Sequence, residues 1–333
     1  MACGRAMKLV FCGTPRFAVH TLEALLAAGY EVALAVTQPD RPVGRDRQIN
    51  APPVKVAALA AGIPVKQPEK IRDNIEFRGL VESIAPDAIV VVAYGRLIPP
   101  WMLALPRLGC INLHASLLPK YRGAAPIQWA VAMGETVTGN TTILLEEGLD
   151  TGPILLQQAL AIGPNQTATD LFDELARGGA PLVAETLAGL ADGSVKPKPQ
   201  NHAGATFAPL LKREDGRMEF AVHTATELKN RWRGFQPWPG AFTVLDGKKL
   251  IVHRMEVALG LQVLGRAGAD AVLPGQIHIE DQRLLVACAG KSWLELLEVQ
   301  LEGKKRLGAA EFLRGAGFGN ELAAGARLGN PAQ

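Results

Sequence analysis

The heptapeptide DAIVVVA, residues Asp87 to Ala93, indicates the fold most clearly. After the aspartate it contains only apolar residues, and most of these are β-branched. The run is too short for a buried helix, and it lacks the apolar–polar alternation of a strand with one exposed face. A continuous apolar run of this length is typical of a strand that is buried on both faces, in a parallel sheet covered by helices.

The residues on either side of this run alternate between strand-like and helix-like patterns. Further strand-like runs are Lys8–Cys12, Glu31–Val36, Cys110–His114 and Thr141–Leu145. Helical spacing of apolar residues predicts helices at Phe17–Ala28, Val54–Ala61 and Ala168–Leu190, the last interrupted at Gly178–Pro181. Strands that alternate with amphipathic helices indicate the α/β class. We therefore expect residues 7–191 to form a doubly wound, mostly parallel, Rossmann-like sheet.

The character of the sequence changes after residue 191. Residues 192–209, DGSVKPKPQNHAGATFAP, contain three prolines among glycine and polar residues, a composition typical of a linker. Residues 210–320 contain one helix candidate, Thr224–Arg233, followed by short strand-like runs that are separated by turn residues such as Asp246-Gly247. Short strands at this spacing predict a small β-barrel of the OB-like kind.

Composition and charge narrow the class of protein. A hydrophobic content of 48% with 20% charged residues is that of a globular protein, and no apolar run is long enough to predict a membrane span. The four cysteines are scattered, without the spacing of metal ligands, so we expect no metal and a reducing, cytoplasmic location. The formal net charge of +3 is small, but all of it comes from the residues after Thr206.

Two polar residues end one of the predicted strands. Asn112 and His114 are two positions apart, so their side chains share one face at the carboxyl end of the strand, where open parallel sheets bind ligands. By itself this pair is more typical of a structural polar pair at the end of a strand than of a reactive site. Asp150 lies in the loop GLDTGP after the next strand of the same sheet, and it is expected to converge on His114. An amide that stabilises an oxyanion, an imidazole and a carboxylate suit acyl or formyl transfer.

Two other kinds of site fit the sequence less well. A hydrolase based on Ser116 would need a strand–turn–helix elbow of the form G-x-S-x-G, whereas Ser116 lies in HASLL. A nicotinamide site would need a glycine-rich turn after the first strand, and Gly13-Thr14-Pro15 lacks its glycines.

A basic loop follows the second predicted strand. Residues 37–50, TQPDRPVGRDRQIN, contain Arg41, Arg45 and Arg47 among proline and glycine. Such arginine density suits phosphate contacts, although a solvated loop can also be basic. In the C-terminal region, further candidates for a basic face are Arg231, Arg233, Lys248, Lys249, Arg254 and the run Lys304-Lys305-Arg306.

Several of these segments together resemble the methionyl-tRNA formyltransferase family. The resemblance rests on GTP after the first strand, TQPDRPVGR, VVVAYGRLIP, INLHASLLPKYRGAAPIQWA, GLDTGPI and FQPWPGA, which follow one another in the family's order. It implies an enzyme of the type that uses 10-formyltetrahydrofolate as formyl donor. The acceptor would be the α-amino group of methionyl initiator tRNA, formylated for translation initiation. A stand-alone sugar-nucleotide N-formyltransferase shares part of the pattern and stays open as an alternative.

The resemblance also implies roles for individual residues. Asn112, His114 and Asp150 would be catalytic, and no covalent enzyme intermediate would be needed. The folate-binding segment would comprise Ser116, Leu117, Leu118 and Pro119, with backbone groups that read the hydrogen-bonding edge of the pterin. Residues 210–320 would bind tRNA. The arginines expected to contact the tRNA are Arg41, Arg45, Arg47 and Arg233. We expect a monomer without a metal or a membrane association.

Overall fold

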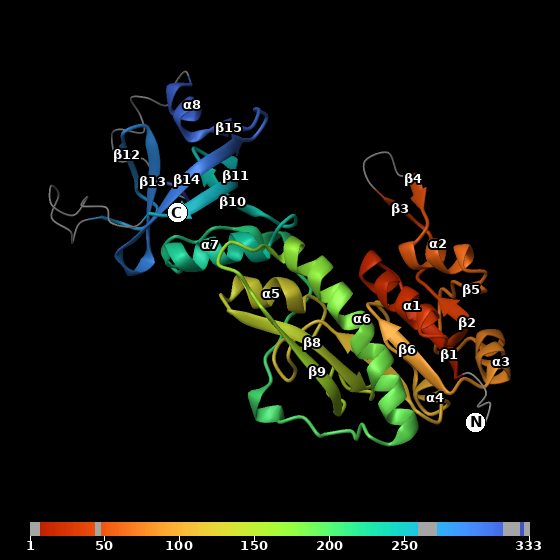
Figure 1. The fold of residues 1–333 in the computed structure, drawn as a ribbon. Coiled ribbons are helices and arrows are strands. Elements are labelled where there is room, and N and C mark those ends of the chain that lie inside the picture. The colour runs from red at the N-terminus through yellow and green to blue at the C-terminus, as the bar shows by residue number, and fades with distance from the viewer. Residues whose placement is uncertain (1–6, 44–47, 259–271, 316–326, 330–333) are drawn as a thin grey trace. The chain divides into compact units, whose positions relative to one another are not determined.

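The apolar run around Val90 becomes an inner strand of a seven-stranded sheet (Figure 1). The computed structural model describes residues 7–43, 48–258, 272–315 and 327–329. The chain divides into two compact units: Met1–Ile127, Thr136–Gly163 and Asp170–Leu210 form the first, and Gln128–Glu135, Pro164–Thr169 and Leu211–Gln333 the second. Within the described residues, no helix has both the length and the apolar composition needed to cross a membrane.

The sheet of the first unit is mostly parallel, as predicted. In spatial order its strands are β5 (Val65–Lys66), β2 (Glu31–Val36), β1 (Lys8–Gly13), β6 (Ala88–Val92), β7 (Cys110–His114), β8 (Val137–Leu144) and β9 (Ile154–Ala161). The first five strands pair in parallel, whereas β8 and β9 are antiparallel to their neighbours. The short hairpin of β3 (Arg41–Val43) and β4 (Gln48–Asn50) extends from the loop after β2.

Helices surround this sheet, and the hydrophobic patterns predict the first two and the last of the following five. They are α1 (Arg16–Ala27), α2 (Pro53–Ala60), α3 (Ile75–Ile84), α4 (Pro100–Leu103) and α6 (Ala168–Asp192). One face of the sheet, with Val10, Ile89 and Cys110, packs in a single core cluster with Phe77 of α3 and Met102 of α4. On α1 and α6, the rings of Phe17 and Phe172 meet edge to face, with centroids 5.2 Å apart.

The predicted interruption of the last of these helices is wrong. α6 runs continuously through Gly178, Gly179 and Pro181. A Cβ atom on Gly179 would lie 2.7 Å from Cδ2 of Leu113 on β7, so the glycine allows the helix to lie directly against the sheet. Tertiary packing therefore stabilises the helix through residues that are poor helix formers.

In the described residues, the second unit is an antiparallel sheet accompanied by helices. Its spatial strand order is β10 (Ala241–Leu245), β11 (Lys248–Val257), β14 (Ser292–Leu301), β13 (Arg283–Cys288) and β12 (Ile277–Glu280), and β15 (Leu307–Gly308) pairs with β14. The helices are α7 (Ala225–Gly234) and α8 (Ala309–Arg314), while most of α5 (Pro126–Ala132) also belongs to this unit. Thr224 caps α7 rather than beginning it, because its hydroxyl accepts the N–H of Glu227.

The described end of the chain links the two outer strands of this sheet. The N–H of Leu328 donates to the carbonyl of Gly275 beside β12 (2.8 Å), and the N–H of Gly329 donates to Val244 of β10 (3.0 Å). Leu328 is buried in the same apolar cluster as Leu250, Val286 and other residues inside the sheet. The sheet thus closes on itself through residues 327–329, a part of the tail to which no sequence motif assigns a role.

Candidate active site

Strand β7 presents Asn112 and His114 on one face of the sheet. The intervening Leu113 contacts α6, so its two neighbours face the opposite side. Asn112 is partly exposed, and within the described part of the chain its amide has no hydrogen-bond partner. His114 is buried, with 5% of its surface exposed. An amide without a partner among the described residues therefore lies beside an enclosed imidazole, on the shared face that the sequence predicts.

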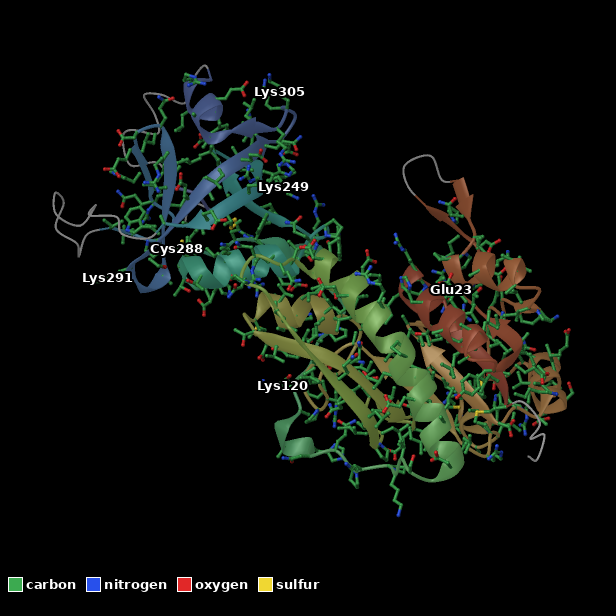
Figure 2. All side chains as sticks on the ribbon, viewed as in Figure 1. Glu23, Lys120, Lys249, Cys288, Lys291 and Lys305 are labelled. Atoms are coloured by element: carbon green, nitrogen blue, oxygen red, sulfur yellow. The ribbon has the colours of Figure 1, made fainter. Side chains whose placement is uncertain are left out.

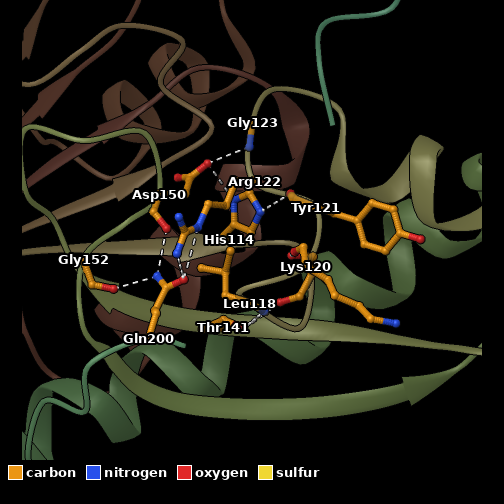
Figure 3. Close-up of polar contacts among 11 residues, drawn as sticks. His114, Leu118, Lys120, Tyr121, Arg122, Gly123, Thr141, Asp150, Gly152 and Gln200 are labelled. Carbon is orange, nitrogen blue, oxygen red and sulfur yellow. Dashed lines mark hydrogen bonds and ion pairs between the residues drawn. The ribbon is translucent and has the colours of Figure 1, made fainter. Parts of the chain in front are cut away.

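The two nitrogens of His114 have different partners (Figure 3). Nε2 lies 2.9 Å from the carbonyl oxygen of Tyr121. Since a carbonyl can only accept, Nε2 carries a hydrogen and donates it. Nδ1 faces Oδ2 of Asp150 at 3.6 Å, which is an ion-pair distance but longer than a hydrogen bond. The ring position that can gain or lose a proton is therefore Nδ1, and it faces a carboxylate.

Asp150 reaches this position from a strained loop between β8 and β9. Its φ is 51°, in the left-handed region that aspartate tolerates better than most residues. Oδ2 accepts the N–H of Gly123 at 2.9 Å, and only 12% of the side chain is exposed. The convergence of Asp150 with His114 that the sequence predicts is therefore present, and a backbone donor fixes the carboxylate.

The segment from Ser116 to Pro119 is held by residues that the sequence gave no reason to select. The hydroxyl of Thr141 donates to the carbonyl of Ser116 (2.6 Å) and accepts the N–H of Leu118 (3.1 Å). Gln157 donates to the carbonyl of Leu118 at 2.9 Å. Both Thr141 and Gln157 lie on strands, on a face that only the pairing of β8 with β7 and β9 brings to this segment.

These bonds change the expectation for the folate-binding segment. Ser116 is fully buried, and its hydroxyl donates to the carbonyl of Lys120 (2.7 Å), so it is placed neither as a nucleophile nor as a ligand contact. The Ser116 carbonyl and both backbone groups of Leu118 are occupied within the protein. Leu117 and Pro119 remain partly exposed, which leaves their apolar side chains as the accessible part of the segment.

A cavity of about 960 Å³ opens at the same edge of the sheet. It lies beyond the carboxyl ends of β1, β2 and β6, and its walls include Thr14, Gln38, Pro39, Tyr94, Gly95 and Arg96. The three loops are tied together, because Thr14 and Gln38 both donate to the carbonyl of Tyr94 and Arg96 donates to Gln38. This is where open parallel sheets bind their ligands.

The hairpin of β3 and β4, which lies within the basic loop, begins beside this cavity. Lys55 and Gln67 both bind the Asp40 carboxylate, and their hydrogen bonds lower the pKa of Asp40. The next residue, Arg41, is exposed and lines the cavity. Arg45 and Arg47 lie outside the described residues.

Arg233 is placed differently from the prediction. It is 5% exposed, and its guanidinium donates to the carbonyl of Gln166 (2.9 Å) and to the side chain of Asn230 (2.7 Å). Burial lowers the pKa of Arg233. Arg233 therefore makes hydrogen bonds inside the second unit and is not accessible to a phosphate backbone. The sequence alone predicts its charge but not its burial.

Several other basic residues of the second unit are on its surface, among them Lys305 (Figure 2). Exposed ones are Lys248, Arg254, Lys304, Lys305 and Arg306. Lys249 is partly buried, 4.0 Å from the centroid of the Phe242 ring, and burial together with nearby Arg213 lowers the pKa of its ammonium group. These cations form a basic surface, although Glu298 and Glu311 pair with some of them.

Both parts of the chain match known protein families. Residues 7–187 match the family model described as formyl transferase, and residues 210–317 match the formyl transferase C-terminal domain. The chain is 62% identical to the methionyl-tRNA formyltransferase of Acidobacterium capsulatum, over 97% of this chain and all of the relative. It is 55% identical to that of Koribacter versatilis, over 93% of this chain and 96% of the relative.

A more distant likeness concerns the fold alone. An N-formyltransferase from Helicobacter canadensis, solved with folinic acid and dTDP-3-aminofucose, superposes with a TM-score of 0.59. The match covers 87% of this chain and 98% of that structure at 17% identity. The two family models account for most of the sequence, and the bacterial relatives match it from end to end. On this evidence the chain belongs to the formyl transferase family.

Proposed function

We propose that this protein transfers the formyl group of 10-formyltetrahydrofolate to the α-amino group of methionyl initiator tRNA. The observation that carries the proposal is the convergence of Asn112, His114 and Asp150 at one edge of the sheet. It occurs in a chain that is 62% identical over 97% of its length to a methionyl-tRNA formyltransferase. The residue types suit attack of an amine on a formyl carbon, and none of them has to become covalently attached to the substrate.

The reaction begins when the neutral amine of the acceptor attacks the formyl carbon. The carbon–oxygen double bond opens to an oxyanion, which the amide N–H of Asn112 stabilises. The new carbon–nitrogen bond remains when the bond to N10 of the folate breaks. The acceptor nitrogen loses one proton, and N10 gains one as tetrahydrofolate leaves. The reaction as a whole therefore neither consumes nor releases a proton. The free amide of Asn112 suits this role because it has no competing partner within the described residues.

His114 and Asp150 move the proton. Nε2 of His114 is committed to the carbonyl of Tyr121, so its exchangeable proton lies at Nδ1 and faces Asp150. Asp150 is slightly the more exposed of the two, with 12% of its side chain accessible against 6% for His114. We infer that Asp150 takes the proton from the attacking amine and that His114 stabilises the resulting charge changes as its partner.

The donor and the acceptor would occupy different parts of the first unit. The accessible apolar surface of Leu117 and Pro119 suits packing against the folate, while the bonded Ser116 and Leu118 hold this surface in place. The cavity beside Arg41 offers room for the aminoacyl end of the tRNA, with the exposed guanidinium available to a phosphate. Arg45 and Arg47 would act with Arg41, and the basic surface of the second unit would bind the tRNA backbone.

One assay tests the proposed function. The purified chain is given 10-formyltetrahydrofolate together with methionyl initiator tRNA, with free methionine or with an amino-sugar nucleotide. We expect formylation of the methionyl-tRNA and almost none of free methionine, which lacks the phosphates. Formylation of the amino sugar but not of the tRNA would instead support a sugar-nucleotide N-formyltransferase. Formylation of none of the three would contradict the enzymatic proposal.

A further inference from the structure

Residues 198–208, expected to belong to a linker, run along both loops of the candidate active site. Lys198 exchanges two backbone hydrogen bonds of 2.8 Å with Ile154 at the start of β9. Further along, the backbone N–H of Arg122 donates to the carbonyl of Thr206 (2.9 Å), and the N–H of Ala208 donates to the carbonyl of Arg122 (2.7 Å). We call these residues the strap. It adjoins the loop of Asp150 on one side and the turn after β7 on the other.

Gln200 is the strap residue whose side chain connects the two loops (Figure 3). It is 5% exposed. Its Nε2 donates to the carbonyls of Asp150 (2.8 Å) and Gly152 (2.7 Å). Its Oε1 accepts Nε and Nη2 of Arg122 (3.2 and 2.6 Å). The orientation of the amide is unambiguous, because carbonyls only accept and a guanidinium only donates.

The residues that Gln200 joins are next to the side-chain hydrogen bonds described above for His114 and Asp150. Arg122 lies between Tyr121, whose carbonyl accepts His114, and Gly123, whose N–H binds the Asp150 carboxylate. The carbonyl that Gln200 holds on the other side is that of Asp150 itself. A shift of Gln200 would therefore move the partners of His114 and the backbone of Asp150 relative to one another.

Two features make external support of this geometry necessary. Asp150 has a left-handed backbone, and Tyr121 also has a positive φ of 61°, so both loops have conformations that their own residues disfavour. Arg122 is 5% exposed, and its side-chain hydrogen bonds go to neutral acceptors, Oε1 of Gln200 and Nδ1 of His202. Without the Gln200 oxygen, a buried guanidinium would lose its closest bond and the turn would relax.

We propose that Gln200 is a positioning residue that sets the distance and orientation between His114 and Asp150. The inference rests on the proposed function, since it assigns a purpose to that same pair. The separation of 3.6 Å between His114 Nδ1 and Asp150 Oδ2 is longer than a hydrogen bond, so proton transfer at this pair depends on small displacements. A misplacement of about 1 Å can lower turnover by about 10²-fold.

Two substitutions separate the functions of the amide. Gln200→Glu keeps an acceptor for Arg122 but replaces the donor to the two carbonyls with an oxygen that repels them. Gln200→Met keeps the length and removes all four bonds. Asn201→Ala is the matched control, because Asn201 is exposed on the same strap and, among the described residues, its side chain bonds only the nearby N–H of Ala203.

The first measurement is steady-state formylation of methionyl-tRNA, alongside thermal unfolding. We expect both Gln200 variants to lower kcat by about 10- to 10²-fold with little change in KM, while Asn201→Ala stays within about twofold of the unchanged protein. Unchanged kcat in Gln200→Met would overturn the proposal. A loss of activity that matches the unfolded fraction at the assay temperature would also overturn it, because the role would then be structural.

The second measurement needs no turnover. The ring signals of His114 are followed by NMR as the pH is changed, with Asp150, Arg122 and His202 as the charged or titratable groups nearby. Displacement of Asp150 alters the ring's electrostatic surroundings, so we expect the midpoint to shift in both Gln200 variants and to stay unchanged in Asn201→Ala. An identical midpoint in all three variants and the unchanged chain would overturn the positioning role. A shift in a chain that formylates no acceptor would support the positioning role and contradict only the proposed function.

Discussion

The charged groups at the proposed catalytic edge of the first unit and those on the basic surface of the second unit have opposite surroundings. His114 and Asp150 are almost enclosed, and each has defined partners within hydrogen-bond or ion-pair distance. On the second unit, the Lys305 side chain is 80% exposed and that of Arg254 is 58% exposed. Enclosed groups act through short distances, and exposed ones act through the sum of many weak, salt-screened attractions.

This contrast predicts different responses to substitution. At the catalytic edge, a single atom should matter greatly and salt should matter little. On the basic surface, one residue should matter little and salt should matter greatly. The following predictions test each side of the comparison, beginning with the largest expected effect.

Asp150→Asn should lower kcat by about 10³-fold, within the range found for general acid–base groups. Asparagine can still accept the N–H of Gly123 through its side-chain oxygen, so the loop should be preserved while the proton acceptor is lost. Single-turnover formylation with saturating enzyme measures the chemical step. A variant with near-normal turnover would show that the carboxylate carries no proton.

Asn112→Ala should lower turnover by about 10²-fold or more, the usual loss for one oxyanion donor. Asn112→Asp is the matched variant, since it keeps the shape of the side chain but cannot donate as a carboxylate. Both should bind methionyl-tRNA normally, which a filter-binding titration can check. If Asn112→Asp retained full turnover, the amide would have no role in stabilising the oxyanion.

The positions proposed to be catalytic also show which parts of the fold and of the candidate site can be predicted from the sequence. β2 and β7 have the predicted bounds because each is a short apolar run whose ends are marked by polar or turn residues. Asp150 was found because the loop that carries it follows a strand of the same sheet. Gln200 could not be found, because it lies in a segment with linker composition and its partners are 48 to 78 positions away in sequence.

Other differences have the same physical origin. The glycines of α6 suggest a break when considered locally, yet Gly179 allows contact with Leu113, which no local pattern shows. In sequence, nothing distinguishes Arg233 from exposed cations such as Arg254, and only the packing around it determines its burial. The closing segment at residues 327–329 lies within an Ala/Gly-rich tail that contains no recognisable strand pattern.

Gly275→Ala should destabilise the second unit by about 1–3 kcal/mol through backbone strain, and by more through a clash with the closing segment. The position has a φ of 85°, and an added Cβ would lie 2.5 Å from the carbonyl oxygen of Leu328. Gly247→Ala is the control, since its φ is 76° but its Cβ would meet nothing within 4 Å. Chemical denaturation should show a larger loss for Gly275→Ala, and equal losses would mean that the closing contact adds no stability.

Lys304→Ala should weaken tRNA binding only a few-fold and reduce the slope of log K against log salt by about one. Lys304 is exposed and carries its charge into solvent. Lys304→Arg keeps the charge and should leave the slope unchanged. An unaltered slope in Lys304→Ala would remove this residue from the phosphate contacts.

The most direct test of the whole account is single-turnover formylation of methionyl-tRNA at increasing enzyme concentration, repeated at several salt concentrations. We expect formyl-methionyl-tRNA to form at a limiting rate that is nearly independent of salt. The enzyme concentration needed for half of that rate should rise steeply with salt as phosphate contacts are lost. Absence of the formylated product, or a salt-independent half-saturation point, would contradict the assignment of catalysis to the enclosed edge and of tRNA binding to the exposed cations.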